Sequence, residues 1–163
     1  MYINKLKDFK QNLAYVRKLL YLCSRKENNS MKSYKHEVKY YECDRMGITH
    51  HSNYVRFMEE ARIDWMDQLG YGFERMEAAG VVSPVMAIEC EYKHPTTFKD
   101  IIDISLRVSE LSALKMSFEY TMKVGETVVC VAKSKHCFLE NGKPVMVEKR
   151  FPEFWEKLVR VKG

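Results

Sequence analysis

The chain has 163 residues, a length that fits one domain with a core of its own. Its 46% hydrophobic and 30% charged residues are typical of a globular protein and exclude a disordered or collagen-like chain. The net charge is +5, and no run of about 18 apolar residues occurs, so the sequence predicts no integral membrane segment.

The positive charge is concentrated in the first thirty residues. Residues 1–30 contain seven Lys or Arg and two Asp or Glu, which leaves 20 of each sign among residues 31–163. Apolar residues recur there at spacings of three and four between the basic ones, which predicts a basic amphipathic helix. We interpret residues 1–30 as an N-terminal extension, with Met31 as a candidate true start, and residues 31–163 as the folded domain. Because this domain is neutral, no nucleic acid is expected as a partner.

The domain begins with a strand-like stretch at residues 34–40, where apolar-leaning and charged residues alternate. A polar segment follows. A helical period then begins after Ser52 or Asn53, both good N-cap residues, and stops at Gly70. The apolar positions give this helix a wide apolar face over roughly four turns, and we expect a curved sheet to wrap it.

A run of strands follows a short helical stretch at residues 73–79. Period-two alternation predicts four strands, at residues 86–92, 102–108, 114–122 and 129–138. Gly125-Glu126 and Asn141-Gly142 are hairpin-turn signals, so the last three strands are expected to be antiparallel neighbours. A last amphipathic helix is expected near the end of the chain. Helices that are segregated from an antiparallel sheet indicate the α+β class.

The cysteines give no sign of a metal site. The five are Cys23, Cys43, Cys90, Cys130 and Cys137, and they form no CxxC pair and no Cys/His cluster with zinc spacing. The sequence therefore predicts no metal and no other cofactor. An odd number of cysteines without a secretory signal favours free thiols in a reducing compartment, so the expected location is cytoplasmic.

The segment between the first strand and the long helix carries the residues of chemical interest. It runs from Tyr41 to Tyr54 and contains the carboxylate of Asp44, a glycine that permits tight turning at Gly47, and His51 just before the helix. The helix N-terminus adds free backbone N–H groups, which favour developing negative charge. A carboxylate together with such donors has the parts that acyl chemistry needs.

This segment resembles the signature of the 4-hydroxybenzoyl-CoA thioesterase family, in which a Gly follows an Asp by three residues. Asp44 and Gly47 match that spacing. His51 and Tyr54 match forms of the signature that also carry a His seven residues and a Tyr ten residues after the Asp. The resemblance extends over residues 34–138 and leaves the N-terminal extension uncovered.

The resemblance implies a hotdog fold, in which a curved antiparallel sheet wraps the long central helix. It implies a thioesterase that hydrolyses an acyl-CoA substrate, with Asp44 as nucleophile or general base and with N–H groups near His51 as the oxyanion hole. Active sites between subunits imply a homodimer, or a homotetramer built from it. We predict Asp44 and His51 as catalytic residues, and Gly47 and Tyr54 as substrate-binding residues.

Structural roles stay open for these residues when they are considered singly. Asp44 alone fits a turn, His51 fits a helix cap, and Tyr54 fits a packing position. An acyl dehydratase on the same fold fits poorly, because its histidine and its acid are expected on the helix. The functional alternative is a non-catalytic hotdog module that binds acyl-CoA without cleaving it.

Overall fold

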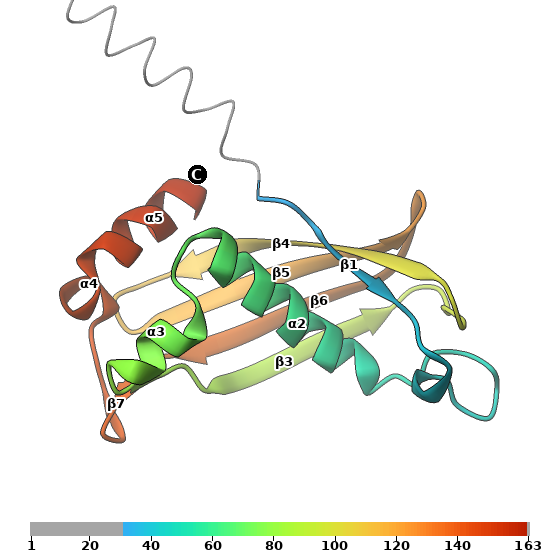
Figure 1. Cartoon of the computed structure of the whole chain (residues 1–163), viewed down its shortest axis with the longest axis horizontal. Coiled ribbons are helices and arrows are strands. Elements are labelled where there is room, and N and C mark those ends of the chain that lie inside the picture. Colours follow the sequence, from blue (N-terminus) through green and yellow to red (C-terminus); the bar gives the residue numbers. More distant parts are fainter. Residues whose placement is uncertain (1–30, 163) are drawn as a thin grey trace, which may run out of the picture. The chain divides into compact units, whose positions relative to one another are not determined.

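The computed structural model describes residues 31–162, so the predicted extension at residues 1–30 lies outside the described residues. Five antiparallel strands form one curved sheet, and a long helix lies across one face of it (Figure 1). The strands are β1 (Tyr34–Glu37), β3 (Val85–Tyr92), β4 (Ile101–Leu111), β5 (Lys115–Val124) and β6 (Thr127–Cys137), in the order β1-β4-β5-β6-β3. The predicted α+β class is confirmed.

Helix α2, Asn53–Gln68, forms the centre of the fold. The apolar residues of its inner face recur every three or four positions and are buried, as the sequence pattern predicts. Trp65 of α2 meets Phe118 of β5 edge to face, with ring centroids 5.3 Å apart. The helix ends just before Gly70, which has a positive φ of 69° that glycine adopts without strain.

Seven short elements complete the described chain. They are η1 (Tyr40–Glu42), α3 (Phe73–Ala78), β2 (Val81–Val82), β7 (Leu139–Glu140), β8 (Lys143–Pro144), α4 (Val147–Arg150) and α5 (Pro152–Lys162). The Gly125-Glu126 turn joins β5 to β6, and both pairs β4–β5 and β5–β6 are antiparallel, as predicted. Asn141-Gly142 is also a hairpin turn, but it joins the two-residue strands β7 and β8.

The first strand is shorter than its alternating pattern predicts. β1 stops at Glu37, and one turn of 3-10 helix occupies residues 40–42. The Glu42 side chain explains the difference, because its Oε2 accepts the backbone N–H of Lys39 at 2.7 Å and stabilises the turn. Tyr40 is consequently 79% exposed instead of lying on the sheet.

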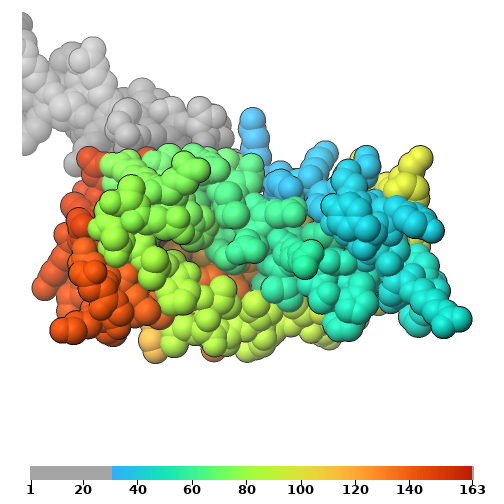
Figure 2. Space-filling view, turned by 60° about the horizontal axis from the view of Figure 1, so that its bottom comes forward, coloured from blue at the N-terminus to red at the C-terminus, as the bar shows by residue number. Residues whose placement is uncertain are grey.

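β3 forms one edge of the sheet, and among residues 31–162 it pairs only with β6. Figure 2 shows this edge, with α2 lying above it. The predicted strand is confirmed, but its large apolar side chains Val85, Met86, Ile88 and Tyr92 are all exposed. A long apolar edge is a surface that proteins usually cover, by a further element or by another chain.

A series of polar side chains crosses the buried face of β5 and β6. The Tyr120 hydroxyl lies 3.0 Å from Ser134 Oγ, which in turn lies 2.7 Å from His136 Nε2. All three residues are buried. Burial, assisted by the positive charge of Arg62, lowers the pKa of His136 from 6.5 to about 4. His136 is therefore neutral in the folded protein at neutral pH.

We expect the free energy of unfolding to fall as the pH drops from about 6.5 to about 4. In that range the unfolded chain takes up a proton on His136 and the folded chain does not, which costs up to ~3 kcal/mol. Urea unfolding across the range measures the decline. His136→Gln should lessen it, and His94→Gln, at an exposed position, should not. An unchanged decline in His136→Gln would contradict the assignment.

Candidate active site

All four predicted site residues lie on or beside the loop that joins η1 to α2. Cys43 and Thr49 pair as an antiparallel bridge and close the base of this loop. Within it, the N–H of Asp44 donates to the Ile48 carbonyl at 2.8 Å, and the N–H of Gly47 donates to the Asp44 carbonyl at 3.0 Å. Gly47 has a φ of +77°, so the tight turn favours glycine at this position.

Asp44 is half-buried at the start of the turn. Its Oδ1 accepts the N–H of Met46 at 2.7 Å, an interaction that fixes the orientation of the carboxylate. Its Oδ2 accepts no hydrogen bond from any residue between 31 and 162. One oxygen thus orients the group, and the other is available to a substrate or to a water molecule.

The N-terminus of α2 presents His51 to the surface. The Asn53 N–H donates to the His50 carbonyl at 3.0 Å, and the Tyr54 N–H donates to the His51 carbonyl at 3.4 Å, so both are already engaged. The His51 N–H has no acceptor among the described residues. The Tyr92 hydroxyl also donates to the His51 carbonyl at 3.1 Å, which ties this point to the end of β3.

A buried hydroxyl cluster lies under the loop. Thr49 Oγ1 is 2.6 Å from Thr96 Oγ1, and the Tyr54 hydroxyl is 3.0 Å from the same Thr96 oxygen. Tyr54 is only 3% exposed, and burial raises the pKa of its hydroxyl, which stays protonated. Within this chain Tyr54 therefore packs and anchors the loop, and its substrate-binding role stays a prediction.

A hollow of about 550 Å³ opens between α2, α3 and the start of β3 (Figure 2). Arg62, Phe73 and Val85 are among the residues that line it. Arg62 is buried, and its guanidinium lies 5.7 Å from the centre of the Phe73 ring. None of the four predicted site residues lines the hollow. The hollow lies at the start of β3, whereas Tyr92, which contacts the Asp44 loop, is at the end of that strand.

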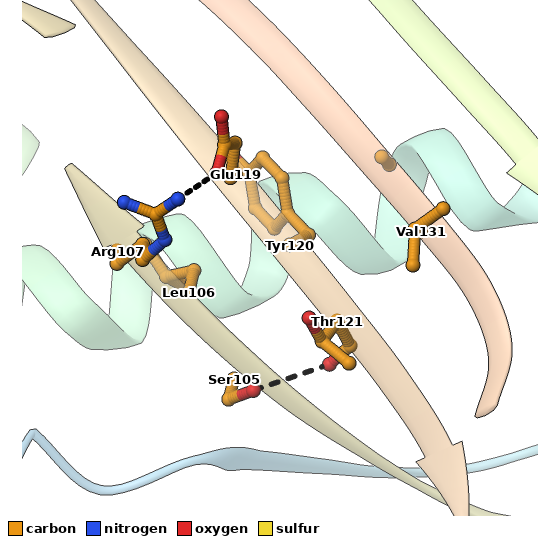
Figure 3. A pocket seen from close by; sticks show the side chains of 8 residues that line it. Ser105, Leu106, Arg107, Glu119, Tyr120, Thr121 and Val131 are labelled. Atoms are coloured by element: carbon orange, nitrogen blue, oxygen red, sulfur yellow. Dashed lines mark hydrogen bonds and ion pairs between the residues drawn. The ribbon is translucent and has the colours of Figure 1, made fainter. Parts of the chain in front are cut away.

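A second hollow, of about 220 Å³, lies over β4, β5 and β6 (Figure 3). Arg107 pairs with Glu119 there, and the Ser105 hydroxyl donates to the Thr121 carbonyl. These are ordinary contacts between neighbouring strands on an exposed sheet face. Asp44 does not line this hollow, and we assign no chemistry to it.

Other chemical groups near the loop offer no competing site. Cys43 Sγ lies 3.9 Å from the Lys39 carbonyl, which is not a base that could activate a thiol. Between residues 31 and 162, no three His, Cys, Asp or Glu side chains gather as a metal ion would require. No helix in the same range is both long and apolar enough to cross a bilayer.

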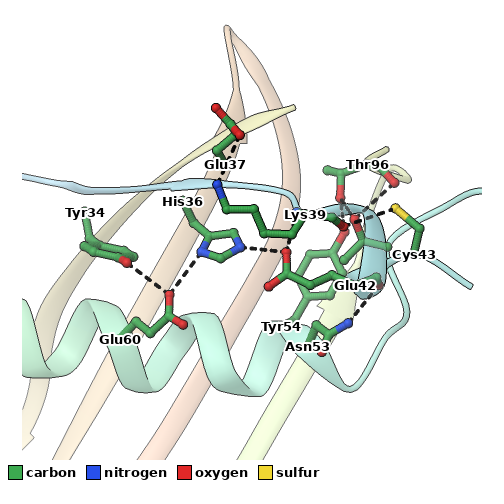
Figure 4. Close-up of polar contacts among 11 residues, drawn as sticks. Tyr34, His36, Glu37, Lys39, Glu42, Cys43, Asn53, Tyr54, Glu60 and Thr96 are labelled. Atoms are coloured by element: carbon green, nitrogen blue, oxygen red, sulfur yellow. Dashed lines mark hydrogen bonds and ion pairs between the residues drawn. The ribbon is translucent and has the colours of Figure 1, made fainter. Parts of the chain in front are cut away.

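A partly buried charged cluster behind the loop was missed by the sequence reasoning (Figure 4). His36 of β1 lies between the carboxylates of Glu42 in η1 and Glu60 in α2. The sequence offered one signal, a glutamate two residues before Asp44. The alternation placed His36 on the inner face of its strand but gave no indication of which side chains it would meet.

Comparisons with known proteins point to one family. The profile of the thioesterase-like superfamily matches residues 38–158. The Bacillus subtilis protein named "Putative acyl-CoA thioesterase YneP" is 32% identical over 121 residues, which cover 72% of this chain and 88% of that protein.

Two solved structures have the same fold. A hypothetical protein from Aquifex aeolicus is 36% identical, covers 77% of this chain and 98% of its own, and superposes with a TM-score of 0.73. The DHNA-CoA thioesterase from Staphylococcus aureus is 25% identical, with 80% and 90% covered and a TM-score of 0.77. The hotdog fold implied by the sequence resemblance is confirmed. This chain belongs to the thioesterase-like superfamily, and it is a thioester hydrolase.

Proposed function

We propose that the protein hydrolyses the thioester of an acyl-CoA and releases a free carboxylic acid and CoA. The observation that carries this proposal is the Asp44 carboxylate, which a tight turn orients through one oxygen while the other oxygen stays free. The turn leads directly into the N-terminus of α2, so an acid and the His51 N–H, which has no acceptor among the described residues, share one loop. The names of the relatives support acyl-CoA as the substrate class.

Asp44 acts on the thioester carbonyl in one of two ways. As a general base, it takes a proton from water, the hydroxide oxygen bonds to the carbonyl carbon, and the C–S bond breaks to release the CoA thiolate. As a nucleophile, it forms an acyl anhydride and expels the thiolate, and water then hydrolyses the anhydride. Both routes need the same free carboxylate oxygen near the carbonyl.

The His51 N–H is the backbone donor that we assign to the oxyanion hole. It is the donor at the start of α2 that has no acceptor within the described residues, and the helix dipole favours negative charge there. The Tyr92 hydroxyl holds the His51 carbonyl and so fixes the direction of this peptide. His51 thus contributes through its backbone, and its exposed ring is free to meet the substrate.

The functional unit in this proposal is a homodimer, or a homotetramer built from it. Two copies that pair through the same sheet edge under two-fold symmetry must run antiparallel. Antiparallel pairing along β3 would bring the start of this strand in one copy close to its end in the other copy. Val85, at the start, lines the hollow, and Tyr92, at the end, contacts the loop of Asp44. Each acyl site would then combine the loop of one subunit with the hollow of the other.

Incubation with a panel of aromatic and aliphatic acyl-CoAs, with free thiol followed over time, tests the proposal. Turnover of at least one of them is the expected result. Saturable binding without thiol release would instead support the alternative, a non-catalytic acyl-CoA binding module.

The predicted cytoplasmic location belongs to the same proposal, because a reducing compartment keeps the described free thiols, Cys43, Cys90, Cys130 and Cys137, reduced.

Replacement of Gly47 by Ala should lower both stability and activity. A Cβ at Gly47 meets no atom within 4 Å, so the substitution causes no clash. The expected loss of ~1 kcal/mol in the free energy of unfolding comes from the positive φ alone. Gly80 has a φ of +78° and equally open surroundings, which makes Gly80→Ala a matched control. Urea unfolding should show similar losses for both variants. Thiol release should slow only in Gly47→Ala, because only that turn carries Asp44, and equal rates in the two variants would contradict this.

A further inference from the structure

The charged cluster behind the Asp44 loop is organised around His36, which is 8% exposed. Its Nε2 lies 2.9 Å from Oε2 of Glu42, and its Nδ1 lies 3.0 Å from Oε2 of Glu60 (Figure 4). The imidazole also packs against Phe57 of α2, with ring centroids 3.9 Å apart. His36 therefore joins three elements, its own β1, the short η1 and the long α2.

Both carboxylate oxygens already accept a hydrogen bond from another group. The Lys39 N–H donates to Oε2 of Glu42 at 2.7 Å, and the Tyr34 hydroxyl donates to Oε2 of Glu60 at 3.0 Å. Burial and the neighbouring Glu60 raise the pKa of Tyr34 to about 12, so this hydroxyl remains a donor. A neutral imidazole would direct one bare lone pair at one of these oxygens. Two donor nitrogens on His36 would therefore match the two acceptor oxygens that face them.

Glu42 also connects the two ends of the loop that carries Asp44. Its carbonyl oxygen accepts the N–H of His50 at 2.8 Å and the side-chain N–H of Asn53 at 2.8 Å. Asp44 follows Glu42 by two residues, and Asn53 is the first residue of α2. The position of Glu42 thus sets where the carboxylate of Asp44 lies relative to the helix N-terminus.

We propose that His36 is a positioning residue for thioester hydrolysis, acting as an imidazolium that bridges Glu42 to Glu60. The bridge fixes the Asp44 loop to α2, and the inference rests on the function proposed above. The titratable groups that face the ring are Tyr34 of β1, Glu42 of η1 and Glu60 of α2. Replacement of the ring removes the bridge, so the Asp44 loop is held less firmly against α2 and kcat declines.

Steady-state kinetics of wild type, His36→Gln and His94→Gln between about pH 6 and about pH 9 test this role. A glutamine at position 36 carries both of its N–H donors on one nitrogen, so it cannot span two carboxylates that contact different ring nitrogens. We expect its kcat to fall at least ~10-fold across this range, with KM changed less than about twofold. His94, which is exposed, serves as the matched control and should keep the wild-type kinetics. A wild-type kcat in His36→Gln across this range would overturn the proposal.

Nitrogen NMR of the imidazole in folded wild-type protein provides a test that needs no variant. Both nitrogens of His36 should show the signature of the protonated ring at neutral pH, even if His36→Gln fails to fold. A neutral ring in an active wild type would overturn the positioning role alone. A wild type that releases no thiol from any acyl-CoA would overturn the proposed function, and the positioning role with it.

Discussion

Asp44→Asn and Asp44→Ala should each lower the rate of thiol release by at least ~10²-fold, because in the proposed reaction this carboxylate acts on the carbonyl. In the wild type the Met46 N–H donates to Oδ1 of Asp44 at 2.7 Å, and the side-chain oxygen of asparagine can accept the same hydrogen bond. The turn should therefore survive the substitution. The loss in Asp44→Asn would then report the missing negative charge and basicity, not a collapsed loop. Initial rates with the best acyl-CoA of the panel, together with urea unfolding, measure both effects.

Asp103 offers a matched control for the loss of one carboxylate. It is half-buried like Asp44, but it lies within β4, opposite Lys123 of β5, outside the candidate site. Asp103→Asn should keep the wild-type rate. Retention of more than about a tenth of the wild-type rate in a folded Asp44→Asn protein would refute the assigned role, since general acid–base groups typically contribute ~10²–10⁴-fold.

The two routes for Asp44 differ in where solvent oxygen first appears. A single turnover in water enriched in heavy oxygen would transfer the label to the Asp44 side chain if an acyl anhydride forms and water opens it at the Asp44 carbonyl. In the general-base route, the label enters only the released acid. Label in the peptide that contains Asp44, measured by mass spectrometry, would therefore demonstrate covalent catalysis.

The parts of the fold that the sequence predicts well are those that local chemistry determines. The apolar spacing of α2 and its stop at Gly70 depend on helix geometry and on a positive φ, and both are properties of a short segment. The Gly125 turn sets the β5–β6 pairing in the same way. The loop that holds Asp44 and His51 could be located from the sequence because the two residues lie seven positions apart, between a strand and a helix. Their catalytic roles stay predictions.

Features that depend on tertiary partners were not predictable from the pattern. The strand at residues 34–40 stops early because a side chain, Glu42, captures the Lys39 N–H. His36 and Glu60 are 24 residues apart, and they meet only because α2 packs beside β1. The alternation along β3 correctly predicts a strand. It carries no information on sheet order, so the exposure of that strand at an edge became visible only in the fold.

The substitution Ile88→Lys should convert the proposed dimer to monomers and abolish most of the thioesterase activity. Ile88 is 39% exposed near the middle of β3, so two-fold pairing along this edge would bring each new lysine close to its symmetry copy. Like charges at such short range, together with the desolvation of each ammonium, should weaken dimerisation by at least ~100-fold. The Asp44 loop would then lose the hollow that the other subunit supplies.

Val159 of α5 provides the control for this substitution, because it is a similar aliphatic side chain, 50% exposed, on an element away from the β3 edge. Sedimentation analysis should give a monomer for Ile88→Lys and the wild-type mass for Val159→Lys, and thiol release should fall only in the former. A dimeric and active Ile88→Lys protein would exclude β3 as the interface. A wild type that is monomeric and fully active would exclude a shared site, and Asp44 would then have to act with groups of its own chain alone.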